Sequence, residues 1–243
     1  MRRTTLAVLV ASAVALLAPA AAQALNVYAA TSLTNVFPAL DRAPRYSFGG
    51  SNTLQLQIER GAPADVFASA NPNEAQALFR EGRCTRPVTF AVNRLVLLIP
   101  NDNPGNVTSV YSLRSGGRRL SIGAAGVPIG AYTRQLLRRL RLSSILSSNT
   151  VSQQTNVGQV SSQVALGAAD AGFVYYTDAL AVRDRTKMLS LPKWAQPPVR
   201  YLICTVRRPG AATAGAAAFI KQVTGRAGRG ALKAYGFGLP PRQ

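Results

Sequence analysis

Residues 25–51 read LNVYAATSLTNVFPALDRAPRYSFGGS, and the same device occurs in them twice. An apolar strand, at 25–30 and again at 46–48, leads into a small turn whose serine, Ser32 or Ser51, is expected to open a helix. A serine at that position caps the helix, and the helix start offers unpaired N–H groups and the positive end of its dipole. Both turns together predict two helices directed at one small anion.

The next part of the chain continues the alternation of strand and helix. We expect the helix after Ser51 to end at Gly61, a buried strand over 65–68 and a helix with Pro72 in its first turn. Repeated strand–helix units are typical of a doubly wound, mainly parallel sheet. Ligands of such sheets bind beyond the carboxyl ends of the strands, which is where Ser32 and Ser51 are expected.

The second half of the chain shows similar turns. An apolar strand at 120–124 is followed by a turn around Ile129, which opens a helix with leucines on one side and arginines on the other. Another helix is expected to begin near Val157. A buried strand then ends at Tyr175 and Tyr176, and a tyrosine there either borders the core or offers its hydroxyl to a ligand.

Both halves therefore predict an α/β protein of two similar lobes. We expect the first lobe to comprise 25–92 plus 207–243 and the second to comprise 93–206. The chain would cross between them near 91–94 and again near 206–209. Two crossings form a hinge, with the ligand held between the lobes.

The first 24 residues are typical of a cleavable export signal. Arg2 and Arg3 precede an apolar run from about residue 6 to residue 17, and Ala22-Gln23-Ala24 forms a small-x-small end. The run is too short to span a bilayer comfortably, and no cysteine stands at the cleavage point. We expect a mature chain that begins at Leu25 and is located in the periplasm.

The chain is strongly basic, with 28 Lys and Arg, 9 Asp and Glu, no His and a formal net charge of +19. Such a balance fits nucleic acid or an acidic membrane as a partner. However, the basic residues are mostly arginines at helical spacing, and no face combines aromatic and basic residues as single-strand binding requires. We interpret the charge as a solvated surface that gathers anions, and no nucleic-acid partner is expected.

Several chemical classes are excluded by residue types. The absence of histidine excludes a Ser–His–Asp hydrolase, and together with the lack of a cysteine cluster it argues against a zinc site. No paired carboxylates supply a general base. No enzyme, bare metal cation or cofactor is expected. Cys84 and Cys204 favour a disulfide in an exported chain, because both flank apolar runs, 95–100 and 201–206, that look like neighbouring strands. Two buried free thiols are the alternative.

Four stretches resemble the periplasmic molybdate-binding proteins of ABC transporters, a branch of the type II solute-binding fold. They are AATSLT (29–34), FGGSNTLQLQIERGAPADVFASA (48–70), GFVYYTDA (172–179) and KAYGFGLP (233–240). The four stretches occur in the family's order, and the match to the family covers nearly the whole mature chain. The resemblance implies the two-lobed type II periplasmic binding protein fold, with the ligand in the cleft between the lobes.

Within those motifs, five positions resemble the family's oxyanion donors. Ser32 and Ser51 resemble the hydroxyl-and-amide donors, and Tyr175 resembles the phenol donor. Ile129 and Val157 resemble the two backbone amides of the other lobe. The resemblance implies a monomer that captures molybdate or tungstate for the membrane permease and ATPase subunits of an importer.

Neutral donors suit a tetrahedral dianion that has lost its protons, because a protonated oxyanion would bring a donor to a site with few acceptors. Sulfate has the same deprotonated chemistry, so a receptor for sulfate or another oxyanion is the alternative function. Three features depart from the family's pattern. The segment from Ser32 to Ser51 is short, Ile129 is bulkier than the usual alanine, and Tyr176 stands where a small residue is usual.

Overall fold

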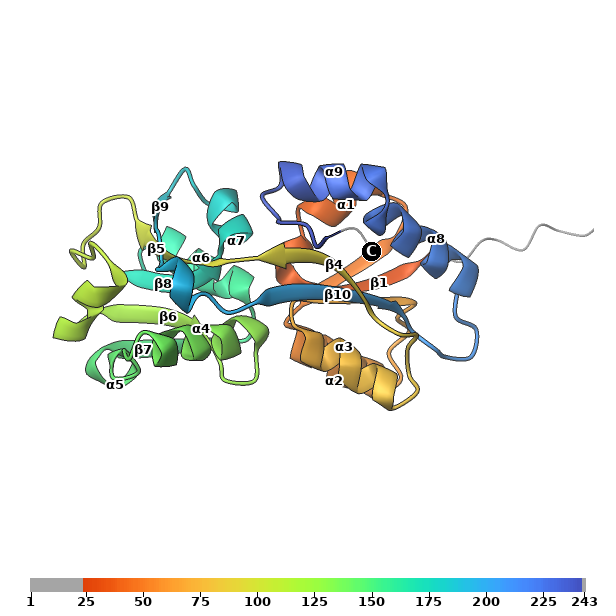
Figure 1. The fold of residues 1–243 in the computed structure, drawn as a ribbon, viewed down its shortest axis with the longest axis horizontal. Helices are drawn as coiled ribbons and strands as arrows, with labels where there is room; N and C mark the ends of the chain where they lie inside the picture. Colours follow the sequence, from red (N-terminus) through yellow and green to blue (C-terminus); the bar gives the residue numbers. More distant parts are fainter. Residues whose placement is uncertain (1–23, 242–243) are drawn as a thin grey trace, which may run out of the picture.

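The structure is a computed structural model that describes residues 24–241. Two α/β lobes lie side by side along the long axis of the molecule, and each is built on one five-stranded sheet (Figure 1). The expected export signal, residues 1–24, lies outside the described residues except for its last residue. Among residues 24–241, no helix has the length and apolar character needed to cross a membrane.

The sheet of the first lobe has the strand order β2-β1-β3-β10-β4. Its strands are β1 (Asn26–Ala30), β2 (Arg45–Gly49), β3 (Val66–Ser69), β4 (Val88–Asn93) and β10 (Val199–Thr205). Its helices are the 3-10 turn η1 (Thr31–Leu33), α1 (Val36–Leu40), α2 (Ser51–Glu59), α3 (Pro72–Arg80), α8 (Thr213–Thr224) and α9 (Arg226–Ala234). Helices α2 and α3 lie on one side of the sheet, and α1, α8 and α9 lie on the other (Figure 1).

The sheet of the second lobe has the order β7-β6-β8-β5-β9. Its strands are β5 (Leu95–Pro100), β6 (Arg119–Gly123), β7 (Thr150–Gln154), β8 (Ala171–Tyr175) and β9 (Thr186–Leu189). Its helices are η2 (Val110–Ser115), α4 (Pro128–Arg139), α5 (Ile145–Ser148), α6 (Val157–Ala165), α7 (Tyr176–Ala181) and η3 (Lys193–Ala195). Strands β5 and β8 are buried along their whole length, as expected for strands covered on both faces.

The lobe boundary differs from the expected one. The first crossing is at Arg94, between β4 and β5, which agrees with the expected 91–94. The prediction that the chain crosses back near 206–209, which would place β10 in a second lobe of 93–206, is wrong. Strand β10 belongs to the sheet of the first lobe, so the second crossing comes before β10. The reason is that β10 pairs antiparallel with both β3 and β4. Each sheet is therefore mixed, with two parallel and two antiparallel neighbours.

Gln196 ties the two crossing segments together. Its side-chain oxygen accepts a hydrogen bond from Leu95 N at 2.9 Å, and its side-chain nitrogen donates to Leu95 O at 2.8 Å. Arg139 of α4 donates to the Gln196 carbonyl oxygen at 2.6 Å. The segment before β10 is thus held beside the start of β5, at the place where the chain passes between the lobes.

A buried aspartate fastens the amino ends of the parallel strands in each lobe. Asp65, just before β3, accepts from Asn26 N of β1 at 2.9 Å and pairs with Arg208 at 2.6 Å. Asp170, just before β8, accepts from the backbone N of Arg119 in β6 at 2.8 Å. Both carboxylates therefore stabilise the fold, and they lie at the sheet edge opposite the turns described below.

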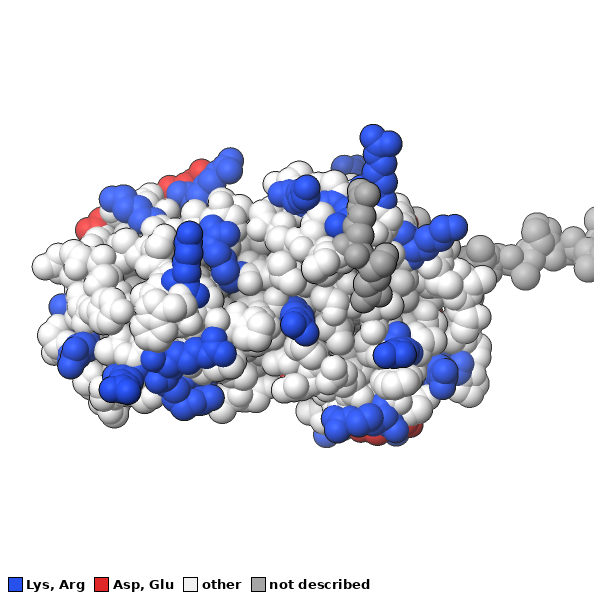
Figure 2. Space-filling model, viewed as in Figure 1, with Lys and Arg blue, Asp and Glu red and all other residues white. Residues whose placement is uncertain are grey.

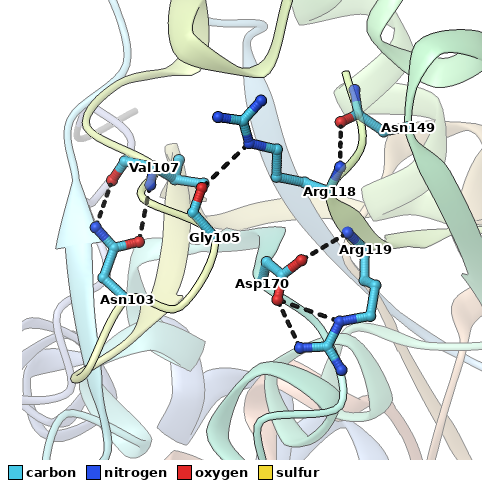
Figure 3. Close-up of polar contacts among 7 residues, drawn as sticks. All are labelled: Asn103, Gly105, Val107, Arg118, Arg119, Asn149 and Asp170. Carbon is cyan, nitrogen blue, oxygen red and sulfur yellow. Dashed lines mark hydrogen bonds and ion pairs between the residues drawn. The ribbon is translucent and has the colours of Figure 1, made fainter. Parts of the chain in front are cut away.

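Figure 3 shows this fastening in the second lobe. The Arg119 guanidinium donates to Asp170 at 2.6 and 3.2 Å, while the neighbouring Arg118 donates to the Gly105 carbonyl at 3.1 Å. Burial alone would raise the pKa of Asp170, but the hydrogen bonds and charge of Arg119 outweigh it and hold the pKa below its usual value. Asp170 is therefore ionised and stabilising at neutral pH.

Cys84 and Cys204 are buried free thiols in the structure. The reason given for pairing them was wrong, because β5 and β10 lie in different sheets. The two residues are nevertheless neighbours, since Cys84 forms an antiparallel bridge with Val206, just past the end of β10. A hydrogen bond with Cys84, together with burial, raises the pKa of Cys204.

Candidate functional site

A small cavity lies between the lobes. The first lobe forms one wall with the turns that follow β1, β2 and β3, and the second lobe forms the other with the starts of α4 and α6 and the end of β8. These turns stand at the carboxyl ends of strands, the edge at which α/β sheets bind ligands.

The structure brings all five predicted site residues to this cavity. Ser32, Ser51, Ile129, Val157 and Tyr175 each line it, and each comes from a different turn. Two belong to the first lobe and three to the second. The five turns expected to carry the ligand donors therefore meet at one cavity.

Neither serine caps a helix as expected. Ser32 lies within the single turn η1, and α1 begins only at Val36. Ser51 is the first residue of α2, and its cap, Gly50, has no side-chain bond. The expectation was wrong because α2 begins one residue earlier than expected, and because Ser32 belongs to a separate 3-10 turn that precedes α1.

The two hydroxyls have other partners. Ser32 Oγ lies 2.8 Å from Tyr201 Oη, and Ser51 Oγ accepts from Ala70 N at 3.1 Å. Since the Ser51 oxygen is an acceptor in that bond, its own proton is free to donate into the cavity.

Ile129 and Val157 contribute backbone N–H groups. They are the second residue of α4 and the first residue of α6, so helix geometry leaves their N–H groups without an intrahelical acceptor. The Asn156 side chain caps α6 by accepting from Gln159 N at 3.0 Å. The bulk of Ile129 is accommodated because its side chain is 1% exposed and packs in the hydrophobic core.

Two buried hydroxyls at the cavity, Thr31 Oγ1 and Tyr175 Oη, have no hydrogen-bond partner among the described residues. An unpaired buried polar group costs free energy, so both favour a polar guest. Burial raises the pKa of Tyr175 well above its usual value, so its phenol stays protonated and can donate. Thr31 was not predicted, and the Thr-Ser pair directly after the first strand was the available signal.

None of the described residues that line the cavity is charged. The positive potential comes instead from the N-termini of α2, α4 and α6, each of which has a residue at the cavity. Arg134 donates hydrogen bonds to the carbonyl oxygens of Gly123 and Gly130 at 3.0 and 3.1 Å. Other basic side chains are spread over both lobes, with no single cluster on the face shown in Figure 2.

Tyr176 lies away from the cavity lining. The guanidinium carbon of Arg94 stands 3.6 Å from the centre of its ring, in a cation–π contact at the first crossing. The bulky residue at this position is therefore accommodated by the crossing segment and leaves the cavity unchanged.

The lobes touch at two glycines beside the cavity. A Cβ added to Gly50 would lie 2.4 Å from the Thr155 carbonyl oxygen, and one added to Gly158 would lie 2.6 Å from Thr31 Cγ2. At position 50 only glycine lets the two backbones approach so closely, and at position 158 only glycine leaves room for the Thr31 methyl group. The structure therefore shows the lobes closed around the cavity.

Residues 24–241 contain no group of three or more His, Cys, Asp or Glu side chains placed to hold a metal ion. The site instead consists of neutral donors, a chemistry that suits a small anion.

Comparison with known proteins agrees with this architecture. Residues 8–238 match the family model of bacterial extracellular solute-binding proteins. The chain is 32% identical over 229 residues to the molybdate-binding protein ModA of Mycobacterium tuberculosis H37Rv, covering 90% of this chain and 86% of that protein. It is 31% identical over 236 residues to ModA of Escherichia coli K12, covering 88% of each.

Solved structures give the same result. The periplasmic molybdate-binding protein of Azotobacter vinelandii superposes with a TM-score of 0.77 at 27% identity, covering 89% of this chain and 99% of that one. The sulfate-binding protein SubI of Mycobacterium tuberculosis H37Rv shares the fold, with a TM-score of 0.74 at 13% identity, covering 88% of this chain and 86% of that one. The expected two-lobed fold is thereby confirmed.

Proposed function

The chain belongs to the bacterial extracellular solute-binding proteins, and we propose that it captures molybdate or tungstate outside the cytoplasm for an ABC importer. It is a binding protein and not an enzyme, and the relatives that it resembles along most of its length are binding proteins as well. It needs no cofactor, and molybdenum arrives as the oxyanion.

The observation that carries this proposal is the convergence of neutral donors from both lobes on one cavity. We assign the hydroxyls of Ser32, Ser51 and Tyr175 and the backbone amides of Ile129 and Val157 as the groups that bind the anion. A hydrogen bond to a charged acceptor contributes roughly 1.5–3 kcal/mol, and the helix dipoles add smaller contributions. Five such donors are sufficient for tight binding without a cationic side chain.

The same donor set selects by protonation. A fully deprotonated dianion can accept from every donor, whereas a protonated oxyanion presents an O–H group to a cavity that offers few acceptors. Sulfate meets the same criterion, so cavity size separates it from the larger molybdate and tungstate ions. The identity to molybdate-binding relatives supports molybdate over sulfate as the main ligand.

The transport role follows from the location of the family. We propose that residues 1–24 direct export to the periplasm, where the mature monomer closes around the anion and delivers it to permease and ATPase subunits in the membrane. The widely spread arginines raise the local anion concentration around the molecule. We expect no nucleic-acid partner.

Calorimetric titration of the chain from Leu25 onward tests the proposal. We expect saturable one-to-one binding of molybdate and tungstate, weaker binding of sulfate and little heat with phosphate. Absence of binding to all four anions would refute an oxyanion receptor. Tighter binding of sulfate than of molybdate would replace the proposal with the sulfate alternative.

A further inference from the structure

Tyr201 connects the lobe crossing to the cavity through a chain of hydrogen bonds. Its Oη lies 2.8 Å from Ser32 Oγ and accepts from Asn93 Nδ2 at 3.4 Å. Asn93 is the last residue of β4, immediately before the chain passes to the second lobe. Tyr201 lies in β10 and does not line the cavity. Its ring packs edge-on against Tyr175, with 5.9 Å between the ring centroids, whereas its hydroxyl reaches the cavity only through Ser32.

The orientation of the Asn93 side chain determines which groups donate and which accept in this series of hydrogen bonds. Its side-chain oxygen accepts from Arg94 N at 2.9 Å, so the amide nitrogen must face the other way. That nitrogen donates to Thr177 Oγ1 at 3.0 Å and to Tyr201 Oη. An amide NH₂ group can only donate, so the Tyr201 oxygen is an acceptor toward Asn93.

The Tyr201 hydroxyl proton then has one hydrogen-bond acceptor within reach among the described residues. Tyr201 is 0% exposed, and edge-to-face contacts with Phe90 and Phe237 hold its ring in place. Burial raises its pKa well above the usual value, so the phenol keeps its proton. Among the described residues, the remaining hydrogen-bond contact of Tyr201 Oη is Ser32 Oγ.

We propose that Tyr201, oriented by Asn93, is a positioning residue that donates to Ser32 and thereby holds the Ser32 hydroxyl as a donor toward the cavity. This assignment rests on the proposed function of the site. Its consequence is specificity: with one lone pair occupied by Tyr201, Ser32 is a poor acceptor for the proton of a protonated oxyanion.

The same series of hydrogen bonds depends on how the two lobes are placed relative to each other. Asn93 belongs to the first lobe, whereas Thr177 belongs to α7 of the second and donates onward to Asp178 Oδ2 at 3.3 Å. The bond between Asn93 and Thr177 joins the lobes as they stand in the structure. Ser32 is thus held in its donor orientation when the lobes are closed.

A double-mutant cycle on the chain from Leu25 onward tests the assignment by calorimetry with molybdate. Tyr201→Phe keeps the ring packing and should weaken molybdate binding about tenfold, since it releases one oriented donor. In a Ser32→Ala background, the same substitution should change the affinity less than twofold. Tyr132→Phe is the matched control, because Tyr132 is another buried tyrosine that does not line the cavity, and its affinity should equal that of the wild type.

A second measurement addresses specificity, using phosphate and sulfate as competitors of nearly equal size at slightly acidic pH. The ratio of their competition constants should shift several-fold toward phosphate in Tyr201→Phe and stay unchanged in Tyr132→Phe. An equal loss of molybdate affinity with and without Ser32, or an unchanged ratio, would overturn the role of Tyr201 while leaving the oxyanion receptor intact. A wild-type chain that binds no tetrahedral oxyanion would overturn the proposed function, and this role with it.

Discussion

Gly50 in the first lobe lies against the carbonyl oxygen of Thr155 in the second, so closely that a Cβ at position 50 would stand 2.4 Å from that oxygen. The φ and ψ of Gly50 are −65° and 134°, values that any residue adopts. The glycine is therefore required by contact between the lobes and not by its own backbone conformation.

Gly50→Ala should hinder closure while leaving each lobe folded. We expect molybdate affinity to fall at least tenfold, because donors of the two lobes no longer meet at the anion, and we expect the melting temperature without ligand to change little. Calorimetry and thermal unfolding measure both. Gly230→Ala in α9 is the matched control, since a Cβ there meets no atom within 4 Å, and equal affinity losses in the two variants would contradict the closure argument.

Single donors should have measurable and separate effects. Ser51→Ala and Tyr175→Phe should each weaken molybdate binding by about 1–3 kcal/mol, the usual loss for one hydrogen bond to a charged acceptor. Tyr46→Phe removes a partly buried hydroxyl that donates to Phe37 O and Asp41 O in the first lobe, so it should lower stability without changing affinity. Calorimetric affinities of Ser51→Ala or Tyr175→Phe equal to the wild-type value would remove that residue from the site.

Asp178 gives the chain a pH-dependent stability. Burial raises the pKa of Asp178 to about 7, so between about pH 4 and pH 7 the folded protein holds a proton that the unfolded chain has lost. Stability from this residue is therefore present in acid and is lost as the pH rises through about 7. Asp178→Asn should raise the free energy of unfolding by at most about 4 kcal/mol above neutral pH and leave it unchanged in acid.

Asp170→Asn is the opposite control for that experiment. Because Arg119 holds the pKa of Asp170 below its usual value, its contribution is present at neutral pH and disappears as the pH falls through that lowered pKa. The variant should be less stable than the wild type at neutral pH and converge with it in acid. Denaturant unfolding across pH separates the two cases, and parallel pH profiles for Asp178→Asn and the wild type would refute the buried-carboxyl explanation.

The cysteines should be protected by the fold. Cys84 and Cys204 are 0% and 1% exposed, so iodoacetamide should label neither in native protein and both after unfolding in denaturant. Intact mass spectrometry counts the labels. Labelling of the native protein would contradict the burial, whereas an unlabelled unfolded chain that becomes reactive only after reduction would establish the disulfide expected from the export signal.

Local signals in the sequence were sufficient for most of the fold and for several of the turns that line the cavity. Strands such as β5 and helices such as α4 follow directly from apolar runs and helical periodicity, and the turns around Ser32, Ser51 and Ile129 follow from small residues at strand ends. The family resemblance then related these turns to Val157 and Tyr175. Turn chemistry is local, which is why a single sequence reveals it.

The pairing of strands that are far apart in the sequence was harder to predict. Whether β10 joins the first or the second sheet depends on antiparallel partners more than 100 residues earlier in the chain, and nothing in its apolar pattern specifies them. The same limit applies to Tyr201, whose contact with Ser32 spans 169 positions. Thr31 was missed for another reason, because an unpartnered hydroxyl is visible only when its surroundings are known.

A crystal structure of the chain from Leu25 onward, grown with molybdate and measured at a wavelength where molybdenum scatters anomalously, would locate the bound anion. We predict one strong anomalous peak in the interlobe cavity, within hydrogen-bond distance of the Ser32, Ser51 and Tyr175 hydroxyls and of the Ile129 and Val157 amides. A peak at surface arginines, with none in that cavity, would contradict it.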